Sequence, residues 1–196
     1  MSGKRSKKPE KKKSKVFFYK DDKTMEIKAG GILFIRGKTI NEVLIQKVVE
    51  NNGKIRHSDF GGKIDDDKDD IVGDITIDDT IARELYEETN EAIRNKSTKE
   101  YLSIAELRKM IDEDIRMEIY IQFAKYLLKI VYFDDDKYEI DFNRTGTHEK
   151  KDNIKRVVEW ITYEEFIKYY KSKSLHPRMD YPSILNFFKV KTFKFK

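Results

Sequence analysis

The sequence predicts an α/β protein built around one mixed β-sheet. Short aliphatic runs, such as KAGGILFI from Lys28 and EVLIQKVV from Glu42, are typical of strands. A later segment, DDTIARELYEETNEAI (78–93), has its apolar residues at helical spacing. Because several strand candidates lie too close together in the sequence for parallel crossovers, we expect the sheet to contain antiparallel pairs.

The first half of the chain contains two strands, a glycine turn and a helix. A polar segment (36–41) joins the two aliphatic runs and fits a hairpin-like connection. The turn-rich stretch NNGKIRHSDFGGKI (51–64) follows, and then the acidic insert DDDKDDIVGD (65–74). In the helix predicted next, Ile81, Ala82 and Leu85 mark the buried stripe.

The second half continues with alternating element types. We expect a helix over 103–112, then two strands or one long bent strand over 117–133, and a polar loop over 137–153. The strand candidate IKRVVEWI (154–161) is followed by a helix, because Thr162 and Glu165 match the capping-box pattern. A last helix is expected over 181–188.

Composition favours one domain over 16–196, with a C-terminal helical extension. Hydrophobic residues make up 38% and charged residues 39% of the 196 positions, which is a polar but foldable balance. The chain has no cysteine and three histidines, so disulfides, thiolate nucleophiles and cysteine-bound zinc are excluded, and any metal should have oxygen ligands. With no membrane-length apolar run and no signal peptide, we expect a soluble cytoplasmic protein.

Residues 1–15, MSGKRSKKPEKKKSK, form a basic tail with almost no apolar content. Such a segment cannot offset the entropy of ordering, so we expect it to be disordered. One interpretation is an arm that contacts RNA, with Lys11, Lys12 and Lys13 as candidate contacts. The other is a solubilising or targeting tail.

The segment most informative about chemistry runs from Arg83 to Asn90, with the sequence RELYEETN. On a helix, Glu84, Glu87 and Glu88 would crowd one side and repel each other. A divalent cation relieves such repulsion, and converging carboxylates suit Mg²⁺ or Mn²⁺.

This segment resembles the signature of the Nudix hydrolases, which reads Gly, five residues, Glu, seven residues, then Arg-Glu-aliphatic-any-Glu-Glu-any-Gly. Five positions of the second part match in order, namely Arg83, Glu84, Leu85, Glu87 and Glu88. Gly62, in the context FGGKI, matches the opening glycine. The resemblance covers roughly 25–170 and implies a Nudix-type α/β/α sandwich with a mixed sheet.

The resemblance also implies roles for individual residues. Glu84, Glu87 and Glu88 would bind the divalent metal, and the carbonyl of Gly61 would be a further ligand. Arg83 would orient a glutamate through an ion pair. Glu87 or another of the acids, or Glu149 on a later loop, would activate the attacking water.

The chain departs from the signature at three places. Seven extra residues are inserted between Gly62 and Arg83. The isolated glutamate of the signature falls on Ile75, so we expect the neighbouring Asp74 to take its role. The terminal glycine is replaced by Asn90, the residue that best tolerates a left-handed cap after glycine.

By resemblance, the expected reaction is the hydrolysis of a diphosphate linkage in a nucleoside diphosphate derivative. The basic tail favours a polyanionic substrate, so removal of the 5′ cap of mRNA, with release of m7GDP, is the leading specific hypothesis. The Lys-, Ile-, Asp-, Asn- and Tyr-rich composition fits an AT-rich genome such as that of a large DNA virus or a parasite, and decapping Nudix enzymes occur in such viruses. The alternatives are a hydrolase of small nucleotides or diphosphoinositol polyphosphates, and a Nudix-like module that binds nucleotide or RNA without cleavage.

Overall fold

The computed structural model describes residues 15–37, 41–50, 52–66, 73–148 and 155–189. Its main sheet contains β3 (Ala29–Arg36), β4 (Glu42–Val49), β5 (Ile55–Ser58), β6 (Phe60–Lys63), β8 (Ile115–Ile121), β9 (Tyr126–Tyr132) and β11 (Arg156–Thr162). The α-helices are α1 (Ile77–Glu88), α2 (Ile104–Asp114), α3 (Phe142–Thr145), α4 (Tyr163–Lys171) and α5 (Pro182–Lys189). Two short ribbons pair β1 (Phe17–Phe18) with β2 (Glu26–Ile27) and β7 (Ile93–Asn95) with β10 (Tyr138–Ile140).

The sheet is mixed, as the sequence predicts. Its strands run in the order β11-β4-β3-β9-β8, with β3 and β9 parallel and the other pairs antiparallel. The first half of β3 pairs with β6, and its last residues pair with β4, which also holds β5. The pairing partner therefore changes at Asp59, from β4 for strand β5 to β3 for strand β6. Gly61 and Gly62 of β6 follow directly after this change.

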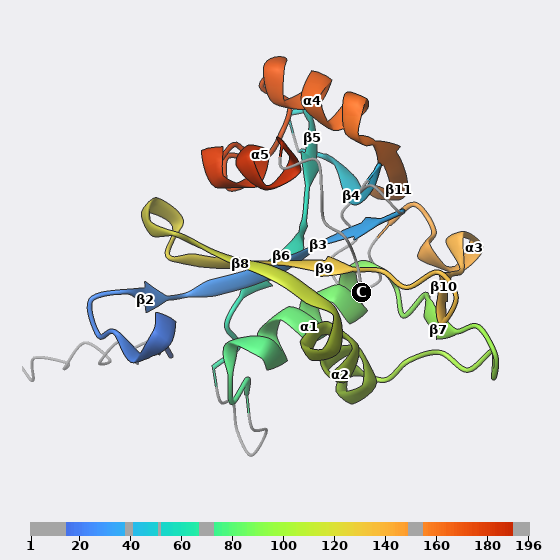
Figure 1. Cartoon of the computed structure of the whole chain (residues 1–196), viewed down its shortest axis with the longest axis horizontal. Coiled ribbons are helices and arrows are strands. Elements are labelled where there is room, and N and C mark those ends of the chain that lie inside the picture. The colour runs from blue at the N-terminus through green and yellow to red at the C-terminus, as the bar shows by residue number, and fades with distance from the viewer. Residues whose placement is uncertain (1–14, 38–40, 51, 67–72, 149–154, 190–196) are drawn as a thin grey trace, which may run out of the picture.

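Helices cover both faces of the sheet, so the predicted α/β/α sandwich is confirmed. Figure 1 shows α1 and α2 below the sheet and α4 and α5 above it. Below, the core contains Ile81, Leu85 and Met110 of these helices against Ile32 and Phe60 of the sheet. Above, the following side chains pack together: Leu33, Ile45 and Leu128 from the sheet, Phe166 from α4 and Phe187 from α5.

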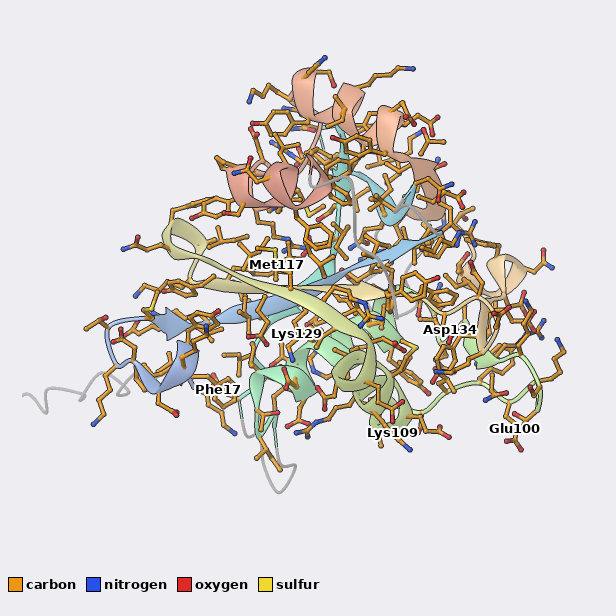
Figure 2. The ribbon with its side chains drawn as sticks, viewed as in Figure 1. Phe17, Glu100, Lys109, Met117, Lys129 and Asp134 are labelled. Atoms are coloured by element: carbon orange, nitrogen blue, oxygen red, sulfur yellow. The ribbon has the colours of Figure 1, made fainter. Side chains whose placement is uncertain are left out.

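A buried lysine ties the lower layer to the sheet. Lys129 lies in β9, between the sheet and the helices below it (Figure 2), and is 4% exposed. Its ammonium group is 2.7 Å from Asp78, in the first turn of α1, and 3.6 Å from Glu118 of β8. A buried cation requires such partners, so the pair with Asp78 fixes the N-terminal end of α1 on the sheet.

Three sequence-based boundaries were wrong. The helix expected over 78–93 ends at Glu88, because Asn90 and Glu91 have φ of 54° and 63° and the chain then enters β7. The turn-rich stretch 51–64 holds two strands, β5 and β6, whose polar residues gave no alternating pattern. The polar loop expected over 137–153 contains β10 and α3.

Two further expectations concern the basic tail and membrane-spanning segments. Residues 1–14 of the basic tail, including Lys11, Lys12 and Lys13, lie outside the described residues. Within the described part of the chain, no helix is both long and apolar enough to span a membrane.

Candidate active site

Helix α1 presents its acidic side to the start of β6. Its N-terminus is fixed by a capping box, in which Thr76 accepts from the N–H of Asp79 and Asp79 accepts from the N–H of Thr76. Ile81 and Leu85 are buried against the sheet. The three glutamates of the signature therefore lie on the side and end of the helix that face the Gly61-Gly62 strand.

Gly62 is in direct contact with Glu84. A Cβ atom at position 62 would lie 2.5 Å from both carboxylate oxygens of Glu84, a separation that real side chains do not show. Only a glycine therefore lets the Glu84 carboxylate lie against the backbone of β6. The lack of a side chain at position 62 is therefore what leaves room for Glu84 at this point of the strand.

Arg83 is the centre of an ion-pair network along the same side of α1. Its Nη1 donates to Glu84 at 2.8 Å and to Glu87 at 3.3 Å. Its Nε and Nη2 donate to the two carboxylate oxygens of Asp74 at 3.1 and 3.0 Å, and Nη2 also donates to the carbonyl of Lys63. Arg83 thus contacts two of the three predicted metal-binding glutamates and connects them to Asp74.

The acid that pairs with Arg83 is Asp74. It lies one position before Ile75, the residue that aligns with the signature's glutamate. Asp74 is 7% exposed, whereas the Ile75 side chain is 68% exposed. Besides the arginine, Asp74 accepts from the N–H of Asp65 at 2.8 Å and from the hydroxyl of Thr80 at 2.9 Å. Burial acts to raise the pKa of Asp74, but these hydrogen bonds outweigh burial and hold the pKa below its ordinary value.

The same contacts close the base of the inserted loop. The N–H of Asp74 donates to the carbonyl of Asp65 at 3.2 Å, so the two ends of the insertion are joined by backbone and side-chain hydrogen bonds. Residues 67–72 within it lie outside the described residues. The insertion therefore leaves Gly62 and Arg83 in contact distance of one network, as tolerance of a longer loop requires.

Glu88 is buried at the C-terminal end of α1 and has partners other than Arg83. One carboxylate oxygen accepts from the N–H of Gly61 at 2.7 Å and from Gln46 at 2.8 Å, and the other is 2.8 Å from Arg156. Burial raises the pKa of Glu88 to about 7, although Arg156 and Arg178 act in the opposite direction.

Asn90 holds the loop that follows α3. Its side-chain amide donates to the carbonyls of Thr145 and His148 at 2.5 and 2.9 Å, and Arg144 donates to the Asn90 carbonyl at 3.2 Å. The left-handed conformation expected at this position is present, with φ of 54°. Glu149, the further acid expected on this loop, lies outside the described residues.

The structure thus brings Arg83, Glu84, Glu87 and Glu88 together with Gly61, Gly62 and Asp74. Among the described residues, no group of three or more His, Asp or Glu side chains converges closely enough to hold a metal ion. The acids instead contact arginines. Sequence reasoning missed Gln46, Arg156 and Arg178, and nothing in their local sequence distinguishes them from ordinary strand or loop residues.

No family model and no curated protein matched the sequence in the comparisons. Solved structures did. The chain is similar to several hydrolases and pyrophosphatases of known structure, one of which is named a Nudix hydrolase. One is the bifunctional NMN adenylyltransferase/ADP ribose pyrophosphatase of Francisella tularensis, complexed with AMP and a manganese ion, which is 23% identical with a TM-score of 0.43. That match covers 71% of this chain, but the chain spans only 35% of the bifunctional enzyme.

Two further solved structures match over most of their length. The Nudix hydrolase of Nitrosomonas europaea is 12% identical with a TM-score of 0.39, and the match covers 83% of this chain and 89% of that one. The Ap4A hydrolase of C. elegans is 14% identical with a TM-score of 0.37, and the match covers 83% and 93% of the two chains.

Proposed function

We propose that this chain is a Nudix-type pyrophosphohydrolase that cleaves a diphosphate linkage in a nucleoside diphosphate derivative. The observation that carries the proposal is the contact of Glu84 with Gly62, together with the Arg83 network that connects Glu84, Glu87 and Asp74. Gly62, Arg83, Glu84 and Glu87 match the signature, and the glycine contacts the helix although an insertion separates the two in the sequence.

The donor chemistry fits Mg²⁺ or Mn²⁺. The carboxylates of Glu84, Glu87 and Glu88 and the carbonyl of Gly61 are hard oxygen donors near β6, and we propose that they would hold the metal once Glu84 and Glu87 turn from Arg83 toward it. Binding requires Glu84 and Glu87 to exchange contacts with Arg83 for contacts with the ion. When bound, such an ion neutralises phosphate charge and lowers the pKa of water.

Formal charge in the network agrees with a divalent guest. The carboxylates in contact are Asp59, Asp74, Glu84, Glu87 and Glu88, and the guanidinium groups are those of Arg83, Arg156 and Arg178. Above the Glu88 pKa of about 7, where every acid is ionised, the five negative charges exceed the three positive ones by two. A network of this kind gains stability from one divalent cation and loses it from added anions.

The residues of the chain have distinct parts in the proposed reaction. Arg83, anchored on Asp74, sets the rotamers of Glu84 and Glu87. The N–H of Gly61 fixes one oxygen of Glu88. We propose Glu87, the most exposed acid of the three, as the group that accepts the proton of the attacking water, with Glu149 as the alternative base.

Among substrates, we propose the 5′ cap of mRNA. The support is the basic tail, including Lys11, Lys12 and Lys13, because clustered cations gain most from ligands with many phosphates. The test is turnover of cap-labelled RNA, free nucleotides, dinucleoside polyphosphates and an inositol pyrophosphate with Mg²⁺ or Mn²⁺. Release of m7GDP supports decapping. Cleavage of small molecules alone would exclude decapping but would still support a pyrophosphohydrolase.

A second candidate is a nucleotide- or RNA-binding module without catalysis. One observation favours it: Glu84, Glu87 and Glu88 contact arginines. Among the described residues, no three acidic or histidine side chains lie close enough together to hold a metal ion. On this account Mg²⁺ changes the affinity for nucleotide or RNA, but no product forms with any substrate of the panel.

A further inference from the structure

Arg178, in the segment that leads into α5, reaches the edge of β6 from the upper layer. Its Nε donates to Asp59 at 2.6 Å, and its Nη2 donates to the carbonyl of Gly61 at 3.0 Å and to the hydroxyl of Ser58 at 3.2 Å. The guanidinium also lies over the ring of Tyr126, 4.8 Å from its centroid. Its side chain is 16% exposed, so this contact set is built into the interior.

The network around Arg178 is closed by Asp59. This fully buried carboxylate accepts from the Tyr126 hydroxyl at 2.6 Å and from the Ser58 hydroxyl at 3.0 Å, in addition to Arg178. The Arg178 charge is therefore compensated locally, and Asp59 fixes the plane of the guanidinium. With Nε committed to Asp59, Nη2 is directed at the Gly61 carbonyl.

Gly61 is held at both of its backbone polar groups by the two helical layers. Its N–H donates to Glu88 at the end of α1, and its carbonyl accepts from Arg178. A Cβ at position 61 would lie 2.2 Å from the Tyr126 hydroxyl and 2.4 Å from the Gly30 carbonyl oxygen, so this position has no room for a side chain. The orientation of this carbonyl is thus determined by Glu88 below and by Arg178 above.

We infer that Arg178 is a positioning residue of the candidate metal site, which it serves by orienting the Gly61 carbonyl, the one neutral oxygen donor proposed there. The inference rests on the proposed function. A carbonyl oxygen has two lone pairs, so one can accept from Arg178 while the other faces a cation. This role of Arg178 makes the segment before α5 part of the candidate metal site.

The role requires two nitrogens of one planar group, because Arg178 contacts Asp59 and the Gly61 carbonyl at the same time. Arg178→Lys keeps the positive charge beside Asp59 but has a single nitrogen, which cannot serve Asp59 and Gly61 with the same planar geometry. Arg178→Met with Asp59→Asn removes both charges together, so no buried carboxylate is left unpaired. Both variants alter the contact with the Gly61 carbonyl while leaving the net charge of the network unchanged.

The test is a titration of the full chain with Mn²⁺ alone, with free Mn²⁺ measured by electron paramagnetic resonance. Two control variants are included. Lys173→Met removes a cation of the same segment that pairs with Asp180 on the surface. Phe166→Leu loosens the upper core without touching Gly61. The thermal midpoint of every variant is measured beside its Mn²⁺ affinity.

We expect the Kd for Mn²⁺ to rise about tenfold in Arg178→Lys and in the double variant, which corresponds to about 1.4 kcal/mol. The Kd should be unchanged in Lys173→Met and in Phe166→Leu, whatever their midpoints. Mn²⁺ binding by wild type with an unchanged Kd in both Arg178 variants would overturn the inference and leave the proposed function standing. Absence of Mn²⁺ binding to wild type would overturn both.

Discussion

Asp74 and Arg83 form a two-point ion pair, in which Nε and Nη2 of the arginine contact the two oxygens of one carboxylate at 3.1 and 3.0 Å. The third nitrogen, Nη1, is then left for Glu84 and Glu87. Asp74 thereby controls where the arginine sits, and through it the two glutamates. The acid that makes this pair is one position before the residue that aligns with the signature's glutamate.

Asp74→Asn should lower kcat/KM about 10- to 100-fold, the range found when a group that orients metal ligands is removed. The physical reason is that Arg83 loses its charged anchor and pairs more tightly with Glu84 and Glu87. The matched control is Ile75→Glu, which supplies the signature's glutamate at an exposed position. Ile75→Glu should not restore activity to Asp74→Asn, and full restoration would show that position 75 can fill the role.

Gly62→Ala should lower kcat/KM about 100-fold, because a displacement of about 1 Å in a reacting group is enough for such a loss. The added Cβ would meet the Glu84 carboxylate at 2.5 Å and push it off the strand. The thermal midpoint should change little, since the side chain of Glu84 can move. Lys63→Ala, at the exposed next position, is the control. Equal activity of Gly62→Ala and wild type would contradict the contact.

Asn90→Gly should reduce the free energy of unfolding by about 2 kcal/mol, for two hydrogen bonds to backbone carbonyls at about 1 kcal/mol each. Asn90→Ala should lose about 1 kcal/mol more, because alanine pays for the left-handed conformation that glycine adopts freely. Urea unfolding measures both. The order Gly above Ala is the decisive part, and the reverse order would show that Asn90 is not held in this conformation.

Stability should depend on pH through His57. The ring is 6% exposed and stacks on Tyr169 with centroids 3.7 Å apart. Burial lowers the pKa of His57 below its ordinary value of 6.5, against the smaller opposite effect of a backbone hydrogen bond with Ser174. The unfolded chain therefore takes up the His57 proton first, so the contribution of His57 to stability is full above pH 6.5 and falls as the pH drops below it. Glu88, whose pKa is raised to about 7, contributes in the opposite direction, so the effect of His57 is read as the difference between wild type and variant.

The measurement is the free energy of unfolding in urea between pH 5 and pH 8. His57→Gln should lose part of the acid-side slope, and a double variant with His176→Gln should lose more, since burial also lowers the pKa of His176. A slope identical to wild type in the double variant would exclude these two rings as its source.

Local chemistry explains what the sequence predicted well. The helical spacing of Ile81 and Leu85 and the capping pair Thr162 and Glu165 each depend on neighbours within about one helical turn, and both are present in the fold. The same holds for the sandwich, because strand and helix periodicities identify which faces must be buried. Asp74 could be named as a candidate from the sequence because it lies next to the position that aligns with the signature's glutamate.

Long-range contacts explain what sequence reasoning missed. Arg178 contacts Gly61 across 117 positions, and Arg156 pairs with Gln46 across 110 positions. No periodicity in a short window encodes such a partner. Strands β5 and β6 were missed because His57 and Ser58 are buried through polar and aromatic contacts, which leave no alternation of apolar residues to detect.

The most direct test of the central claim is metal-dependent turnover of the best substrate of the panel by wild type, Glu87→Gln and Glu164→Gln, the last an exposed acid of α4. The account predicts that wild type and Glu164→Gln release product with Mg²⁺ or Mn²⁺ and stop when the metal is chelated. Glu87→Gln should lose at least about 100-fold in kcat, the lower end of the contribution of general acid–base catalysis. Turnover in Glu87→Gln equal to wild type, or turnover that survives chelation, would contradict the account.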